Sequence, residues 1–365
     1  MELTKCKLGE LITQRREKND GADLPICGVS KDGLIPPKQK DADTSIYNVF
    51  YRDDFIFNPA RMELNSIAIN DMYDRAICSS LYEVFYVHRT DLLLPHYLKL
   101  IIRQKWFTRY CEFLGQGSAR EYCRFGNISE IEIEFPPIEE QQKIVDYNTA
   151  IENRIALKQK INDNLLATTQ AIYKSWFVDF EPFDNVCPSD WENGCVDDIA
   201  EFYDSMRKPL SSLERADMER IYPYYGAVSI VDYVNDFIFD GEYLLLSEDG
   251  IYVVDENGHP LLQHITGKFW ANNHAHILKG KSGFNEDSLY LFLANTNMAP
   301  IVTGAAQPKI NQANLKSFPI TIPTSEVIEN FNALIQPFFD QRLSNEAEVK
   351  KLESLKDLLL SRLVN

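Results

Sequence analysis

The chain has 365 residues, of which 45% are hydrophobic and 25% are charged. This is the composition of a folded globular protein, and because a single core usually stops growing at about 250 to 300 residues, we expect at least two domains. The chain contains no apolar run of about 18 residues and begins without the apolar stretch of a signal peptide, so we expect a soluble, cytoplasmic protein.

The net charge of −17 argues against a simple nucleic-acid-binding protein, because contacts to phosphates need basic groups. The acidic excess is local: residues 182–322 contain 9 Lys and Arg against 20 Asp and Glu, whereas residues 1–137 contain 18 against 20. If the protein binds DNA, its second half must use a few local cations, or a partner must supply positive charge. The seven cysteines include no C-x-x-C pair, which predicts reduced thiols and no structural zinc.

Residues 1–137 are typical of an α+β domain. A helix is predicted over residues 92–113, with Pro95 in its first turn. A polar loop with Gly117 follows, and it leads into a short strand that ends at Pro136.

Residues 138–181 predict a long amphipathic helix, the clearest local signal in the sequence. Apolar residues recur at spacings of three and four without Gly or Pro between them. Residues 138–176 would span roughly 60 Å, which one small domain cannot cover, so the apolar stripe should meet another long helix. The stripe residues expected to pair helices or dock partners are Ile144, Ile151, Ile155, Ile161, Leu165, Ile172 and Trp176.

Residues 182–322 predict a second α+β domain. Runs at 224–228, 237–246 and 269–278 are rich in β-forming residues and are bounded by Gly and Asn turns. A short helix is predicted over residues 287–295.

Residues 323–365 predict a second long helix, with Ser325 as its N-cap and a kink or break at Pro337. Its apolar stripe is expected to include Val327, Phe331, Leu334, Phe338, Val349, Leu352 and Leu359.

The two halves of the chain form an internal repeat. The sequence GSAR at 117–120 precedes Pro136, as GAAQ at 304–307 precedes Pro323, and both correspondences have an offset of 187 residues. The starts of the two halves also correspond, since LGELI at the first start matches VDDIA at the second. A shared order of start, polar loop, strand, proline and helix predicts two copies of one structural plan.

The residues resemble the specificity subunits of Type I restriction-modification systems, over essentially the whole chain. The stretches that carry the resemblance are FPPIEEQQKI at 135–144, IENRI at 151–155, IYKSWFVDF at 172–180, YPYYGA at 222–227, NNHAH at 272–276, QPKIN at 307–311 and FPI at 318–320. The loop at 118–123 departs from the pattern that 305–310 follows, and no counterpart of Trp191 precedes the first domain.

The resemblance implies a non-catalytic α+β protein with two repeated target recognition domains, at 1–137 and 182–322. Each would read half of a bipartite double-stranded DNA target. The helices at 138–181 and 323–365 would be antiparallel, would set the unread spacer, and would dock methyltransferase subunits, with restriction and translocase subunits in the full complex.

The sequence lacks the motifs of an enzyme. The nearest approach to a methyltransferase loop is NPAR at 58–61, which lacks the second proline and the aromatic residue and is interpreted as a turn. No Walker A sequence is present, and we expect no cofactor. His274 and His276 would share one face of a strand, with His259 and His264 nearby, but the spacing indicates no third ligand, so no metal site is predicted.

Candidate DNA contacts are polar or basic residues in loops and strands, where structural turns and solvated surface are the competing interpretations. In the first domain they are Lys38, Lys40, Arg61, Ser118, Arg120 and Arg124. In the second they are Arg207, Lys208, Tyr224, Tyr225, Lys268, Asn272, Asn273, His274, Gln307, Lys309 and Asn311.

Two other functions remain open from the sequence. One is a coiled-coil adaptor that joins two protein-binding domains, which the acidic second half would suit, and the other is an enzyme that uses His274 and His276. Salt-dependent DNA binding would support the specificity subunit, salt-insensitive protein binding would support the adaptor, and bound metal would support the enzyme.

Overall fold

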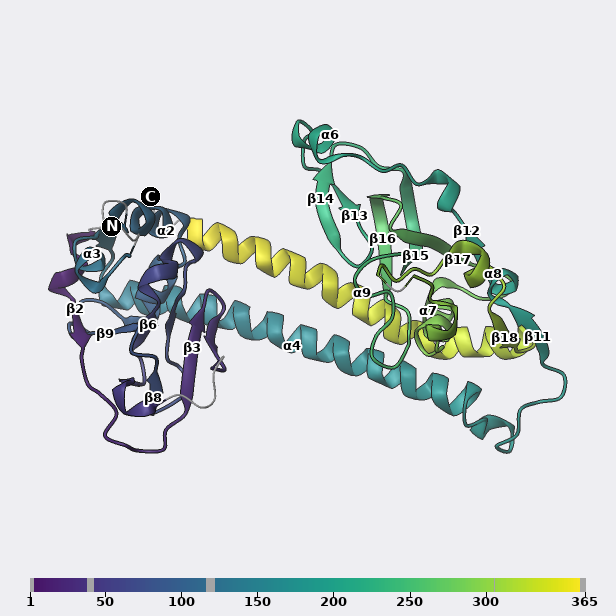
Figure 1. Ribbon diagram of the computed structural model, residues 1–365, viewed down its shortest axis with the longest axis horizontal. Helices are drawn as coiled ribbons and strands as arrows, with labels where there is room; N and C mark the ends of the chain where they lie inside the picture. The colour runs from purple at the N-terminus through teal and green to yellow at the C-terminus, as the bar shows by residue number, and fades with distance from the viewer. Residues whose placement is uncertain (1–2, 38–42, 116–121, 305, 362–365) are drawn as a thin grey trace. The chain divides into compact units, whose positions relative to one another are not determined.

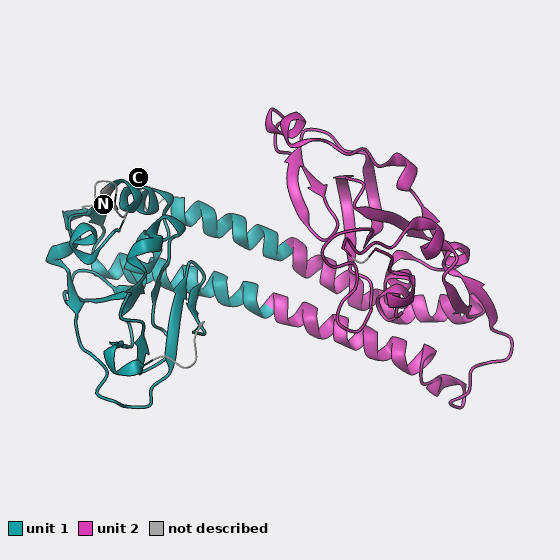
Figure 2. Ribbon diagram, viewed as in Figure 1, with its two compact units in different colours: residues 1–157, 348–365 teal, residues 158–347 magenta. Residues whose placement is uncertain are grey.

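A computed structural model describes residues 3–37, 43–115, 122–304 and 306–361 (Figure 1). The chain divides into two compact units (Figure 2): the first contains residues 1–157 and 348–365, and the second contains residues 158–347. Each unit combines an α+β domain with parts of two long helices. Among the described helices, none is both long and apolar enough to cross a membrane.

The first unit contains two four-stranded sheets, with orders β2-β9-β6-β7 and β4-β3-β8-β5. Alternate residues of β6 face different cores: Phe55 and Phe57 belong to one cluster, and Ile56 belongs to another. This explains why the strand is apolar at every position. The strands are β1 (Thr4–Lys7), β2 (Ile12–Arg15), β3 (Ile26–Ser30), β4 (Gly33–Ile35), β5 (Asn48–Tyr51), β6 (Phe55–Phe57), β7 (Ile67–Ile69), β8 (Arg75–Cys78), β9 (Glu83–Val87) and β10 (Glu132–Phe135).

The helix predicted over residues 92–113 begins at Pro95, as expected, but it is two helices. Between them, the Arg103 guanidinium donates hydrogen bonds to the backbone and side-chain oxygens of Asn65. The helices of this domain are η1 (Leu8–Glu10), η2 (Thr44–Ile46), η3 (Pro59–Leu64), α1 (Pro95–Ile102), α2 (Lys105–Gly115) and α3 (Phe125–Ser129).

The domain of the second unit is built on one six-stranded sheet with the order β12-β17-β15-β16-β13-β14. The predicted β-rich run at 269–278 covers the end of β16, a turn and the start of β17. The strands are β11 (Glu192–Cys195), β12 (Ala200–Phe202), β13 (Tyr222–Tyr225), β14 (Ile230–Val234), β15 (Phe239–Ser247), β16 (Leu262–Ala271), β17 (Ala275–Gly280) and β18 (Pro319–Ile322).

The helix predicted over residues 287–295 is α7, and the Asn285 side chain caps it by accepting a hydrogen bond from the Ser288 amide. The helices of the second unit, besides the two long ones, are η4 (Glu181–Phe183), α5 (Val196–Ile199), η5 (Asp204–Met206), α6 (Ser212–Ala216), α7 (Glu286–Ala294), η6 (Ala299–Ile301) and α8 (Gln312–Lys316).

Both long helices are present, as α4 (Ile138–Phe177) and α9 (Ser325–Ser361). Two details differ from the prediction. Ser325 is the first helical residue rather than the N-cap, and α9 continues through Pro337 without a break. A proline inside a helix costs about 3 kcal/mol, whereas burying a large apolar side chain contributes about 1.5–3 kcal/mol, so burial of Ile335 and Phe339 beside it offsets the cost.

The two long helices run antiparallel within each unit. In the first unit, the Lys356 ammonium lies 2.7 Å from the Glu152 carboxylate. In the second unit, the buried Asn345 amide donates a hydrogen bond of 2.7 Å to the Asn162 side chain, and Asn345 accepts one of 2.9 Å from Lys158. A buried polar group at a helix interface disfavours other alignments, so this pair fixes the register.

The apolar stripe of α4 is partly as predicted, since Ile151 is buried and Ile144, Ile172 and Trp176 pack against the two domain cores. In α9 the buried apolar residues are Ile328, Phe331, Ile335 and Phe339. Phe339 is therefore in the core, whereas Phe338 is only half-buried and Leu334 is exposed. Adjacent apolar residues at 327/328, 334/335 and 338/339 fit the helical period equally well, which is why the sequence alone did not select the buried row. The other predicted stripe residues, Ile155, Ile161, Leu165, Val349, Leu352 and Leu359, are half-buried.

The internal repeat is confirmed in the structure. Strand β1 pairs antiparallel with β10, with Thr4 opposite Phe135, and β11 pairs antiparallel with β18, with Glu192 opposite Ile322. These pairs are related by offsets of 187 to 188 residues. Each pair leads directly into one of the long helices, so the repeated part of each domain is the part that joins it to a helix.

Candidate nucleic-acid interface

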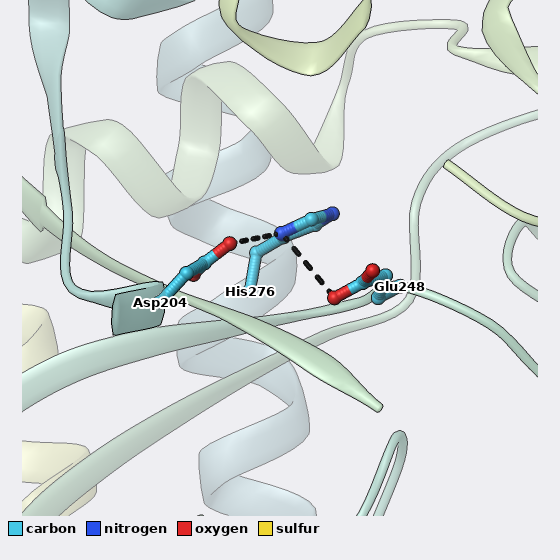
Figure 3. A group of neighbouring side chains, drawn as sticks. All are labelled: Asp204, Glu248 and His276. Carbon is cyan, nitrogen blue, oxygen red and sulfur yellow. Dashed lines mark hydrogen bonds and ion pairs between the residues drawn. The ribbon is translucent and has the colours of Figure 1, made fainter. Parts of the chain in front are cut away.

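The second domain contains a buried cluster of ionic groups (Figure 3). The Asp204 carboxylate lies 2.7 Å from Nδ1 of His276, and the Glu248 carboxylate lies 3.8 Å from the same atom. The Arg207 guanidinium binds Glu248 at 2.5 Å and donates a hydrogen bond of 2.6 Å to the Ala275 carbonyl. Arg207 was predicted as a phosphate contact, but its side chain is only 14% exposed and is already engaged by protein acceptors.

His276 is fully buried, and both of its ring nitrogens face acceptors. Nε2 lies 2.8 Å from the Ile310 carbonyl, while Nδ1 faces Asp204. Burial opposes ionisation of Asp204, but the hydrogen bond and charge of His276 outweigh it and hold the pKa of Asp204 below its usual value. The cluster is therefore an internally compensated network that supports the fold.

This network anchors the polar loop that the sequence repeat singled out. The Lys309 ammonium binds Glu248 at 2.9 Å, and the Gln312 amide donates a hydrogen bond of 2.8 Å to Asp204. Gly304 has a φ of +85°, which a glycine adopts without strain. Asn311, a predicted DNA contact, caps α8 instead by accepting a hydrogen bond from the Asn314 amide, whereas Gln307 is exposed.

The predicted NNHAH motif forms the turn between β16 and β17 and the first two residues of β17. The buried Asn272 side chain accepts a hydrogen bond of 2.8 Å from the His274 amide, so its role is structural, while Asn273 and His274 are exposed. The His274 ring lies 2.6 Å from Asp249, which also forms a backbone bridge to Lys309. The turn and the anchored loop therefore meet at Asp249 and form one polar surface.

His274 and His276 do not converge on one site, because the first is in the turn and the second is in the core. Two neighbours of the polar surface were not predicted, Ile251 and Tyr252, which are 82% and 72% exposed. Exposed large apolar side chains beside polar ones are typical of a binding surface. Their only signal in the sequence is an apolar pair directly after Gly250.

The remaining predicted residues of the second domain divide between core and surface. Tyr224 is 1% exposed, and its hydroxyl accepts a hydrogen bond from the Leu210 amide, which places it in the core. Tyr225 is half-buried and packs against Phe269. Lys208 and Lys268 are exposed.

In the first domain, Lys38, Lys40, Ser118 and Arg120 lie outside the described residues. The exposed Arg61 lines a cavity of about 1030 Å³. The NPAR segment is a turn, as interpreted, because Asn58 caps η3 by accepting a hydrogen bond from the Ala60 amide. Arg124 is exposed and lies 3.3 Å from Glu83.

A basic hollow in the first domain was not predicted. It has a volume of about 470 Å³, and its charged lining consists of Lys31, Arg103, Lys105 and Arg109 with the single acid Glu112. Burial lowers the pKa of Arg103, whereas Lys31, Lys105 and Arg109 are exposed. Arg103, Lys105 and Arg109 lie within seven residues of the chain, whereas Lys31 comes from the turn between β3 and β4, so the sequence marks only part of the hollow.

Comparisons with known proteins show which family the chain resembles. The family model described as the Type I restriction modification DNA specificity domain matches residues 6–167 and again residues 188–356. A putative type I restriction enzyme specificity subunit from Haemophilus influenzae is 36% identical over 38% of this chain and 36% of its own length. The specificity subunit of type I restriction enzyme MjaIX from Methanocaldococcus jannaschii is 25% identical over 75% of this chain and 69% of its own length.

The fold is also similar to a solved structure, the S subunit of the Type-I restriction-modification system from M. genitalium. The similarity covers 100% of this chain and 96% of that chain, with a TM-score of 0.60 and 14% sequence identity. Two repeated α+β domains on long helices, matched twice by the family model, place the chain in the DNA-recognition and non-catalytic component of these systems. The chain belongs to the Type I restriction-modification DNA specificity family.

Proposed function

We propose that the chain recognises a bipartite double-stranded DNA target, with one half-site read by each α+β domain, in the cytoplasm. The long helices set the unread spacer and bind methyltransferase subunits, to which restriction and translocase subunits are added in the full complex. The repeated junction between domain and helix carries the proposal, because two copies of one reading module joined by long helices suit a target in two parts.

In the second domain, the base contacts are assigned to the exposed side chains around Asp249. Asn273 and Gln307 present amides that can pair with adenine, and the nearby acids can accept from cytosine amino groups. Ile251 and Tyr252 supply apolar contact, as a thymine methyl group requires. The exposed Lys208 and Lys268, with Lys309, are assigned to the phosphates.

In the first domain, the phosphate contacts are assigned to the basic hollow and to two further exposed arginines. The hollow offers four cations against one acid, whereas the surface around Asp249 is mixed in charge. Because phosphate contacts position a protein without reading sequence, this hollow would orient the domain on the duplex. Arg61 and Arg124 extend the basic surface.

The helical docking surface is assigned to apolar side chains that the helix pair leaves exposed. In the first unit these are Tyr147 and Leu157 of α4, at 65% and 57%, and Leu355 and Leu358 of α9, at 45% and 50%. A pair of long helices does not need to expose such residues, so a protein partner is their simplest occupant. A basic partner there would also offset the acidic second domain.

Methylome sequencing tests the proposal directly. Cells that produce this chain with methyltransferase subunits should carry methylation in a two-part sequence, and cells that lack this chain should not. Methylation in a single uninterrupted sequence would contradict the bipartite proposal. Salt-insensitive binding to proteins, with no DNA binding in the complex, would support the adaptor instead.

A further inference from the structure

A second group of acid and histidine side chains lies in the second unit, away from the surface around Asp249. Glu242 is on β15 and His264 is on β16, diagonally across the antiparallel pair in which Leu244 is opposite His264. Residues in this relation share one face of the sheet. Oε1 of Glu242 lies 2.6 Å from Nε2 of His264.

Asp287, in the first turn of α7, completes the group. Its Oδ1 lies 3.5 Å from Nδ1 of His264. Asp287 is 3% exposed, and Oδ1 has no hydrogen-bond partner among the described residues. Its other oxygen, Oδ2, accepts a hydrogen bond of 3.2 Å from the Gln336 amide of α9. Gln336 therefore holds one oxygen of the buried Asp287 carboxylate in place. The other oxygen lies near His264 but accepts no hydrogen bond from the described residues.

The charges around this group are not balanced by protein cations. Asp340 and Glu286 are further acids that act on Asp287, and Lys279 lies 3.7 Å from Glu286. The Asp204 cluster is the opposite case, because Arg207, Lys309 and Gln312 all donate into it.

We propose that Glu242, His264 and Asp287 bind a divalent transition-metal ion, with Zn²⁺ or Mn²⁺ as the fitting class. One ligand atom from each side chain lies within 4.8 Å of the other two. Small shifts would bring such atoms to the distances of about 2.0–2.2 Å that Zn²⁺ requires from histidine and carboxylate ligands. The ion would bind the unprotonated ring nitrogen of neutral His264, and water would complete the coordination on the side of the half-exposed Glu242.

The ion would connect the six-stranded sheet to α7 and stabilise the packing of both on helix α9. The Gln336 side chain positions Asp287 from that helix, and the Phe339 ring lies 5.9 Å from the His264 ring. A hydrogen bond that orients a metal ligand in this way commonly strengthens the site. The metal site does not depend on the proposed DNA target, because it concerns how the second α+β domain is attached to α9.

The test uses the full-length chain, freed of metal with EDTA and then titrated with Zn²⁺ or Mn²⁺ alone. We expect one bound equivalent by elemental analysis after gel filtration, and a rise in the unfolding temperature. Asp287→Asn keeps the side-chain shape, and Glu242→Gln changes a half-exposed position. Each should weaken binding by about tenfold or more, as measured by calorimetry, because each removes a ligand.

The matched control is His259→Gln, which removes a histidine beside a single carboxylate, Asp255, at 3.5 Å. It should bind metal like the unmodified chain. Circular dichroism reports whether each variant is folded. If Asp287→Asn does not fold, the metal affinity of Glu242→Gln alone tests the proposal. No stoichiometric uptake at micromolar metal would overturn the proposal, and the three side chains would then have a structural role only. Equal affinity in the control and both ligand variants would overturn it as well.

Discussion

The two α+β domains share one kind of junction with the helices but differ in their interiors. The first is built on two four-stranded sheets and carries a basic hollow, whereas the second is built on one six-stranded sheet and carries a buried ionic network. The pairs β1–β10 and β11–β18 nevertheless have matching registers. Duplication has therefore preserved the part that attaches each domain, while the part assigned to DNA has diverged in both sheet topology and charge.

Replacing residues 186–322 with the matching segment of a relative gives the largest expected effect. If the domains read independently, one half-site should change completely and the other should not change, because contacts made by separate domains contribute nearly additively. Methylome sequencing of cells with the chimera measures both half-sites at once. The reciprocal exchange of residues 1–137 is the control, and a change in both half-sites from either exchange would show that the domains are coupled.

Arg207→Ala tests the buried network of the second domain. It removes a cation from the nearly buried Glu248, so we expect a loss of about 3 kcal/mol in the free energy of unfolding. Urea denaturation measures this loss. The matched variant in the first domain is Arg124→Ala, whose 65% exposed side chain makes a surface pair with Glu83, and its expected loss is below about 1 kcal/mol. Equal losses in the free energy of unfolding would contradict the inferred difference between the buried network of the second domain and the surface pair of the first.

Lys105→Ala and Arg109→Ala test the basic hollow of the first domain. In the complex with methyltransferase subunits, each should weaken DNA binding similarly for all sequences and reduce the salt slope by about 1. Arg89→Ala is the control, because that side chain is exposed but already bound to Asp91 at 2.8 Å. An altered half-site in place of a reduced salt slope would mean that the hollow reads bases.

Asp204→Asn gives the smallest effect, a change in acid stability. The pKa of Asp204 is lowered in the folded state, so its ionised form stabilises the protein above the unfolded pKa of about 3.8, and this contribution disappears as the pH falls toward the folded pKa. The variant should therefore be less stable than the unmodified chain at pH 7, with the difference shrinking below about pH 4. Thermal unfolding at both pH values measures it, and a constant difference would exclude the ionic role of Asp204.

The features predicted from the sequence are local or repeated. The long helices follow from apolar spacing, the α7 helix from a short apolar run, and the duplication from matching loops and prolines. The features that the sequence missed depend on contacts between distant segments. From its sequence context Arg207 is typical of a surface cation, but in the structure it binds Glu248 and the Ala275 carbonyl. The basic hollow combines Lys31 with Arg109, which lie far apart in the chain.

The choice between Phe338 and Phe339 shows a second limit. Both residues fit the helical period, and only the core of the second domain determines which of them is buried. A different cluster, with Val234 and Trp270, makes Tyr224 a packing residue, although its neighbours resemble a recognition segment. Residue type and spacing thus predicted the elements well, but they did not show which side of each element faces the protein.

The buried Asn162–Asn345 pair limits how the helical connection can change in evolution. Because this pair fixes the register, a residue inserted into α4 alone would move Glu152 away from Lys356 while leaving Asn162 in place. A single insertion in α4 should therefore destabilise the helix pair. A change in the length of the helical connection requires matched changes in both helices on the same side of the Asn162–Asn345 pair, such as loss of residues 155–161 together with 346–352. If the helices set the DNA spacer, as proposed, the spacer length should change only through rare, simultaneous changes in both helices. The surfaces assigned to DNA can change one residue at a time.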